Sequence, residues 1–102
     1  MAKIINAVSV RKDGSLYLFK NVYRRMGEPQ KVRVMINEEQ SMILLSPSDE
    51  EEDDIYNVNK SRSLYIKDIY RVLGYKIYPI GRKKIDFCDK DVIIYLKEKF
   101  NE

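Results

Sequence analysis

One segment of this sequence occurs twice, and that repeat limits the possible folds more than any other feature. Residues 15–27 align with residues 63–74 once Phe19 is skipped, with seven of twelve pairs identical and four more conservative. Fainter similarity continues beyond both segments. Internal repeats of this kind are units that bury a core against a neighbouring copy. We therefore predict two degenerate copies of one unit, residues 1–47 and residues 60–102, which share one core. Residues 48–59 form the linker between them.

Within the first copy, the spacing of apolar residues predicts a hairpin followed by a short helix. Apolar residues alternate on both sides of Asp13-Gly14, a dipeptide typical of tight turns because glycine tolerates a positive φ. The spacing then changes to that of a helix over residues 20–26. Asn21 is a residue type that starts helices, and Gly27 stands where a helix would stop.

The rest of each copy reads as a closing hairpin. Apolar runs predict strands at residues 32–36 and 42–45, with weaker counterparts at 78–85 and 92–96 in the second copy. The last strand runs into residues 97–100, which we interpret as a frayed terminal helix. The chain is thus predicted to be mainly β with short helices, an α+β fold. The copies could pair within one chain, as a monomeric pseudo-dimer, or across two chains, as a homodimer.

Charge is distributed unevenly, although the total is only +3. Residues 1–47 contain eight Lys or Arg against four Asp or Glu, and residues 60–102 contain eleven against six. Residues 49–54 are all acidic. Basic regions are the electrostatic signature of a polyanionic partner. We interpret the acidic run as a solvated linker because adjacent like charges repel. The alternative is a nucleic-acid mimic or a self-inhibitory segment lying over a basic half.

The composition argues against several classes of function. The chain has one cysteine, Cys88, and no histidine, so we expect neither a disulfide framework nor a common zinc site, and no cofactor. Without histidine no side chain has an ordinary pKa near neutrality, and Cys88 has no evident activator, so we predict that the protein is not an enzyme. No apolar run nears the roughly 18 residues of a membrane span. With no secretory pattern at the N-terminus, we expect a cytoplasmic protein without a membrane partner.

The first half of the chain resembles the AbrB/SpoVT-type swapped-hairpin domain of bacterial and archaeal transition-state regulators and antitoxins. Residues 10–18 resemble that family's basic strand, Gly-centred turn and second strand. Residues 22–27 resemble its short helix, and residues 31–36 with 42–45 resemble its closing hairpin. The second half matches more weakly, over residues 62–96. The resemblance implies tandem AbrB-like units in one chain.

That resemblance also implies a DNA-binding transcriptional regulator or an antitoxin-like protein, of the kind that mobile elements encode. The DNA contacts that it carries over lie on the basic strand, turn and helix, with one match in the second copy: Arg11, Lys12, Ser15, Arg24, Arg25 and Arg71. A further basic cluster consists of Arg82, Lys83 and Lys84. Its composition fits either a phosphate contact or a solvated strand edge that discourages association between sheets. The alternative function is a non-enzymatic protein-interaction module on the same fold, such as a phage-encoded inhibitor or adaptor. It is favoured by the degraded second copy and by the acidic run.

The tyrosines divide into repeated and unrepeated positions. Tyr17 and Tyr65 are equivalent in the repeat, as are Tyr23 and Tyr70, and repetition favours core packing because one shared core needs the same shape twice. Two unrepeated tyrosines, Tyr75 and Tyr78, are candidates for a surface that stacks on bases or anchors a protein partner.

Overall fold

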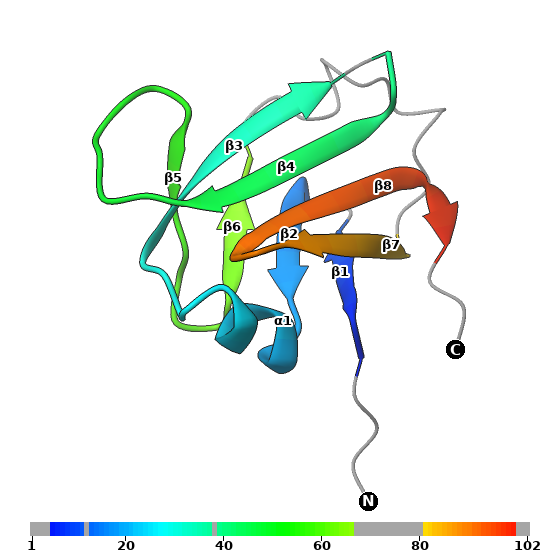
Figure 1. Cartoon of the computed structure of the whole chain (residues 1–102), viewed down its shortest axis with the longest axis horizontal. Coiled ribbons are helices and arrows are strands. Elements are labelled where there is room, and N and C mark those ends of the chain that lie inside the picture. The colour runs from blue at the N-terminus through cyan, green and yellow to red at the C-terminus, as the bar shows by residue number, and fades with distance from the viewer. Residues whose placement is uncertain (1–4, 12, 38, 67–80, 100–102) are drawn as a thin grey trace, which may run out of the picture.

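The computed structural model describes residues 5–11, 13–37, 39–66 and 81–99, which form a mainly β structure with one short helix (Figure 1). The elements in chain order are β1 (Ala7–Val10), β2 (Ser15–Leu18), α1 (Lys20–Arg25), β3 (Lys31–Asn37), β4 (Met42–Pro47), β5 (Ile55–Asn57), β6 (Ser63–Tyr65), β7 (Gly81–Cys88) and β8 (Asp91–Lys99). The prediction of a mainly β chain with short helical structure is confirmed at this level.

All eight described strands belong to one antiparallel sheet, in the order β5-β3-β4-β8-β7-β1-β2-β6. The two outermost strands, β5 and β6, also contact each other, so the sheet is nearly closed and barrel-like. Figure 1 shows the strands curving around a common interior, with α1 at one end. Residues 67–80, which include the predicted second helix and part of its following strand, lie outside the described residues.

The interior is filled by alternate residues of each strand, as the period of two in a strand requires. Leu16 and Leu18 point inward from β2, and Ile43 and Leu45 point inward from β4, all four being 0% exposed. Side chains from β1, β3, β6, β7, β8 and α1 complete one continuous core. Lys83 is also buried, at 1% exposed, because it occupies an inward position of β7.

The predicted hairpin and helix are confirmed, with one change at the helix start. Gly14 has φ +89° in the turn between β1 and β2, and Gly27 has φ +88° just after α1. The helix begins at Lys20, with Phe19 as its N-cap residue and no side-chain cap. Asn21 therefore lies inside the first turn, and its amide donates instead to the Asn6 side chain.

The closing hairpin of the first half is also confirmed, since β3 and β4 cover both predicted strands. The predicted terminal helix is wrong for residues 97–99, which continue β8 as a strand. The cause is tertiary: a register shift between Lys83 and Lys84 lets β7 keep pairing with β8 as far as Lys99. In the part of the chain that the structure describes, no helix has the length and apolar character needed to cross a membrane.

Candidate nucleic-acid interface

A row of outward-facing side chains crosses four neighbouring strands of the sheet. Arg82 of β7 pairs with Ser9 of β1, Ser9 pairs with Tyr17 of β2, and Tyr17 pairs with Ser63 of β6. Arg82, Ser9 and Tyr17 alternate with core residues, so their side chains point away from the core. Ser63 is only 4% exposed and accepts a hydrogen bond from Arg11. The small serines leave room for the longer side chains on either side.

Tyr17 lies between two arginines from distant parts of the chain. The guanidinium carbon of Arg11 is 4.6 Å from the centre of the Tyr17 ring, and that of Arg62 is 5.5 Å from it. Arg62 also donates from Nη2 to the Tyr17 hydroxyl at 2.6 Å and from Nε to the Leu18 carbonyl at 3.2 Å. Arg11 donates to the Ser63 hydroxyl at 3.4 Å. Both arginines are therefore held in place by ring contact and hydrogen bonds.

A second ring extends this arrangement towards β7. Phe19 meets Tyr17 edge to face, with ring centres 5.1 Å apart, and the Arg82 guanidinium lies 5.1 Å from the centre of the Phe19 ring. We call this surface the arginine–aromatic face, formed by Arg11, Tyr17, Phe19, Arg62, Tyr65 and Arg82. The flat guanidinium packs on an aromatic ring, and its N–H groups match pairs of phosphate or carboxylate oxygens.

The turn between β1 and β2 is fixed by Asp13 and Ser15. Asp13 Oδ1 accepts from the Ser15 amide at 2.9 Å and from its hydroxyl at 2.6 Å, and these bonds lower the pKa of the Asp13 carboxyl below its ordinary 3.8. Ser15, a predicted phosphate contact, is buried and its hydroxyl is engaged in this turn. Lys12, the neighbouring predicted contact, lies outside the described residues, as does Arg71.

The predicted helix contacts are separated from this turn. Strand β2 joins the two, so α1 lies at the opposite end of the sheet from the β1–β2 turn (Figure 1). Arg24 is exposed on α1, and the Arg25 guanidinium lies 4.5 Å from the centre of the Phe87 ring. The structure therefore does not bring Arg11 together with Arg24 and Arg25.

The basic cluster on β7 is divided between the two faces of the sheet. Arg82 and Lys84 point outward and are exposed, whereas Lys83 points into the core. Lys84 lies 3.9 Å from a carboxylate oxygen of Glu98 and 5.9 Å from the centre of the Tyr95 ring. Of these three predicted contacts, only Arg82 belongs to the arginine–aromatic face.

The acidic run is exposed from Asp49 to Asp53, as expected for a solvated linker, but it folds back over β3. Arg33 reaches three of its carboxylates, at 2.7 Å from Glu50, 3.2 Å from Glu52 and 3.1 Å from Asp54. The hydrogen bond from Arg33 lowers the pKa of Glu50, whereas the hydrogen bond between Glu50 and Glu52 raises the pKa of Glu52. Basic side chains of β3 pair with this acidic run. These contacts agree with one part of the alternative prediction, in which the acidic run lies over a basic half of the chain.

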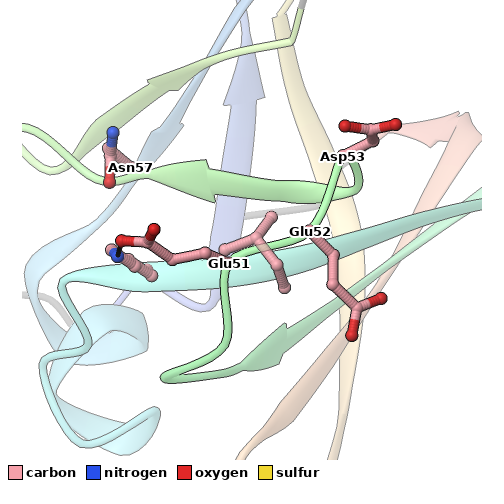
Figure 2. Close-up of a pocket in the computed structure, with 6 residues that line it drawn as sticks. Glu51, Glu52, Asp53 and Asn57 are labelled. Carbon is pink, nitrogen blue, oxygen red and sulfur yellow. Dashed lines mark hydrogen bonds and ion pairs between the residues drawn. The ribbon is translucent and has the colours of Figure 1, made fainter.

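Beside this run, a shallow cleft of about 310 Å³ lies between Lys31 of β3, the acidic run and β5. Glu51 pairs with Lys31 at 2.7 Å. Figure 2 shows Glu51, Glu52 and Asp53 pointing in different directions from the loop rather than towards one point. Among the described residues no cluster of three or more possible metal ligands is present.

The opposite side of the sheet is apolar on its outer surface. Met35, Leu44 and Ile93 lie in one cross-strand row over β3, β4 and β8, and Met35 is 42% exposed. With three neighbours they line a groove of about 290 Å³: Ile36, Asn37 and Met42. The run over residues 42–45 is apolar on both faces, so its sequence does not distinguish the inward from the outward side chains.

The prediction of core packing for Tyr17 and Tyr65 is wrong. Tyr17 is half-buried on the outer surface, and Tyr65 is 61% exposed. The alternation in Ser-Leu-Tyr-Leu carries the signal that was missed, since burying Leu16 and Leu18 forces Tyr17 outward. Tyr23 is half-buried beside the core and donates to the Pro29 carbonyl at 2.7 Å. The three other tyrosines of that analysis lie outside the described residues: Tyr70, Tyr75 and Tyr78.

Comparison with known proteins gives no match, whether among family models, curated proteins or solved structures. The fold and the face define a mainly β protein with a nearly closed sheet and a cationic, aromatic outer surface. The AbrB-type resemblance stays a prediction.

Proposed function

We propose that this chain is a non-enzymatic DNA-binding protein that holds its ligand on the arginine–aromatic face. The observation that carries the proposal is the placing of three guanidinium groups, those of Arg11, Arg62 and Arg82, on two adjoining aromatic rings. These arginines come from three separate segments, and the fold brings them onto one outward surface.

The chemistry of this face suits a polyanion. Arginine binds phosphate through paired N–H donors, and its planar group tolerates stacking on a ring better than a lysine ammonium does. Each such ring contact at an exposed site stabilises the arginine by about 0.5–1 kcal/mol. The side chains are thus ordered before the ligand arrives, which reduces the entropy lost on binding.

The finer fold proposal is that the chain consists of two swapped-hairpin units in tandem, forming a monomeric pseudo-dimer. Its first support is the strand order. If β1 to β4 are exchanged in turn with β5 to β8, every pair of neighbouring strands in the nearly closed sheet is still a pair of neighbours, and the order around the sheet is the same read in the opposite direction. The hairpin β7–β8 lies between β4 and β1, as expected if hairpins of the two units interleave.

The second support is the register of the pairing. Leu16 pairs with Leu64, and these two leucines are equivalent in the sequence repeat. On either side, Ser15 pairs with Tyr65 and Tyr17 pairs with Ser63, so the exchange of units turns one pair into the other. This is the register that an approximate twofold axis through Leu16 and Leu64 requires.

The third support is the backbone of the two turns before these strands. Gly14 donates its amide to the Arg11 carbonyl at 3.0 Å, and Arg62 donates to the Asn59 carbonyl at the same distance. Gly14 and Arg62 are equivalent positions, and both have positive φ, +89° and +60°. A positive φ is costly for arginine, so its use at the equivalent position favours a common turn geometry inherited by both copies.

A salt titration tests the DNA-binding proposal. Fluorescence anisotropy with a labelled DNA should show binding whose log affinity falls linearly with log salt concentration, with a slope of about −2 to −3 for three phosphate contacts. Arg82→Gln should weaken binding by about tenfold at low salt and reduce the slope by about one, because one charge-assisted contact is lost.

Lys90→Gln is the matched control, because Lys90 is an exposed cation in the turn between β7 and β8, at the opposite end of β7 from Arg82. It should leave the slope unchanged. Equal effects of the two substitutions would show that binding follows total charge and would contradict the assignment to this face. Absence of binding at low salt would reject the proposal altogether.

The second candidate function is the protein-interaction module, and the apolar groove around Met35, Leu44 and Ile93 is the observation that favours it. The two candidates separate in a nuclease-treated lysate. The module predicts one stoichiometric protein partner that is retained by Arg82→Gln and lost with Met35→Glu, and the DNA-binding proposal predicts no such pattern.

A further inference from the structure

Tyr65 is the most exposed large apolar side chain of the described structure. It lies on the outer surface of β6, is 61% exposed, and has only the small Ser15 directly opposite it on β2. Within the described part of the chain, no cation and no second ring lies over the Tyr65 ring. The pairing of β6 with β2 places the ring on the outer surface, so it presents an aromatic surface to solvent.

The equivalent tyrosine of the other unit has different surroundings. Tyr17 is covered by Arg11 and Arg62, whereas the positions equivalent to these arginines around Tyr65 are Asn59 and Gly14. The surroundings of the two equivalent tyrosines therefore differ: two arginines lie over the Tyr17 ring, and no cation among the described residues lies over the Tyr65 ring.

The two rings are close enough to serve one ligand. Tyr17 pairs with Ser63, and Tyr65 is two residues further along β6, which makes the tyrosines diagonal neighbours on one face. In antiparallel sheets such neighbours are about 7–8 Å apart. A ligand with one flat apolar group and adjacent anionic groups would contact the open ring and the arginines together.

We propose that this face binds single-stranded nucleic acid, with one base stacked on Tyr65 and the adjacent phosphates held by Arg62 and Arg11. The proposal rests on the proposed function and names its ligand more closely. Only an unpaired, unstacked base offers its flat surface to a tyrosine ring, because each base within a duplex is already stacked on both sides. Outward aromatic rings beside cations on a β surface are the arrangement that single strands use.

The test measures anisotropy with labelled oligo(dT), oligo(rU) and a DNA duplex of equal length, at low salt. The wild-type chain should bind the single strands more tightly than the duplex. Tyr65→Leu should weaken single-strand binding by about 5- to 150-fold, the range for losing one stacked base, whereas Tyr65→Phe should keep it because the ring remains. Comparable binding of dT and rU would indicate recognition of base and phosphate alone, and a preference between them would add a contact to the 2′-hydroxyl or to the thymine methyl group.

Two controls separate this effect from a general loss of structure. Tyr95→Leu removes a ring on the far side of the sheet, where Tyr95 donates to Asp86 at 2.7 Å, and it should leave binding unchanged. A thermal melt of Tyr65→Leu should match the wild-type chain, since the ring is mostly exposed.

The failures of the two proposals are distinguishable. Tighter binding of the duplex, or single-strand binding that Tyr65→Leu does not change while Arg82→Gln weakens it, overturns the single-strand proposal and leaves the DNA-binding face intact. No binding of any of the three probes overturns the proposed function, and the single-strand proposal with it.

Discussion

A single pair of side chains holds the turn that carries Arg11. Asp13 accepts two hydrogen bonds from Ser15, which lower the pKa of its carboxyl, and Gly14 between them adopts the positive φ that the turn needs. The Arg11 amide in turn donates to the Ser15 carbonyl at 2.9 Å. The ionised form of Asp13 therefore stabilises the turn that follows Arg11.

Replacing Ser15 tests this dependence. Ser15→Ala removes the hydroxyl that donates to Asp13, so the pKa of Asp13 should rise towards its ordinary 3.8. A carboxyl whose pKa is lowered by folding stabilises the fold above its unfolded pKa and loses that contribution as pH falls through the folded value. Ser15→Ala should thus reduce stability above pH 3.8 and make little difference in stronger acid. Carboxyl titration by NMR, with acid unfolding curves, measures both effects, and an unchanged Asp13 pKa would contradict the assignment.

At the scale of elements, the acidic run and β3 form one electrostatic unit. Arg33 contacts Glu50, Glu52 and Asp54, and Lys31 contacts Glu51. All of these groups are at the surface, where individual ion pairs contribute little and salt screens them. Their combined effect is to keep the loop between β4 and β5 close to the sheet.

Removing Arg33 should release part of this loop. In Arg33→Gln the pKa of Glu50 should rise, because its lowering comes first from the Arg33 hydrogen bond, while the pKa of Glu51 should stay low, because Lys31 is its partner. Cleavage after Glu50 by a Glu-specific protease should become faster. Arg24→Gln is the control, since Arg24 is an exposed arginine with no ion pair among the described residues. Equal protease rates in both variants would contradict this role of Arg33.

The pH dependence of this unit has two signs. The lowered pKa values of Glu50 and Glu51 mean that both stabilise the folded loop above their ordinary pKa of 4.5 and lose that effect as pH falls. The pKa of Glu52 is raised, chiefly by its bond with Glu50. Its contribution is therefore favourable in acid and is lost as pH rises.

Local patterns predicted the elements that depend on neighbours in sequence. The turn at Asp13-Gly14, the helix ending before Gly27 and the strands of the first half follow from glycine conformation and apolar period. The terminal strand at residues 97–99 did not, because its pairing depends on a register shift in β7. Of the candidate site, Arg11 was named from the family resemblance and Arg82 from its basic cluster. Arg62 was not among the predicted contacts and Tyr65 was predicted to pack in the core, since only the pairing of β2 with β6 brings Arg62 to Tyr17 and Tyr65 to the outer surface.

At the scale of the whole molecule, neither half of the chain has a complete sheet. In the first half, β1 pairs with β2 and β3 pairs with β4, but these hairpins are joined only through β7 and β8 on one side and β5 and β6 on the other. The buried side chains of both halves belong to one cluster. Unfolding should therefore be a single cooperative event.

Substitutions at the centre of the pairing test this expectation. Leu16 and Leu64 are 0% and 1% exposed and lie opposite each other, so Leu16→Ala and Leu64→Ala should each cost about 2–5 kcal/mol in the free energy of unfolding. Both should shift one shared transition in urea, and the double variant should differ from the sum because the side chains are neighbours. Met35→Ala, at a 42% exposed position, serves as the surface control. Two separate transitions would contradict a common core.

The position of the final hairpin has a consequence for the growing polypeptide. Because β7 and β8 fill the space between β1 and β4, the strands made earlier keep two open hydrogen-bonding edges until β7 and β8 have left the ribosome. Open edges invite pairing with other chains. Synthesis that stops before residue 81 would thus yield a product in which β1 and β4 each have an unpaired edge. Rapid completion or shielding of the nascent chain would protect these edges from self-association.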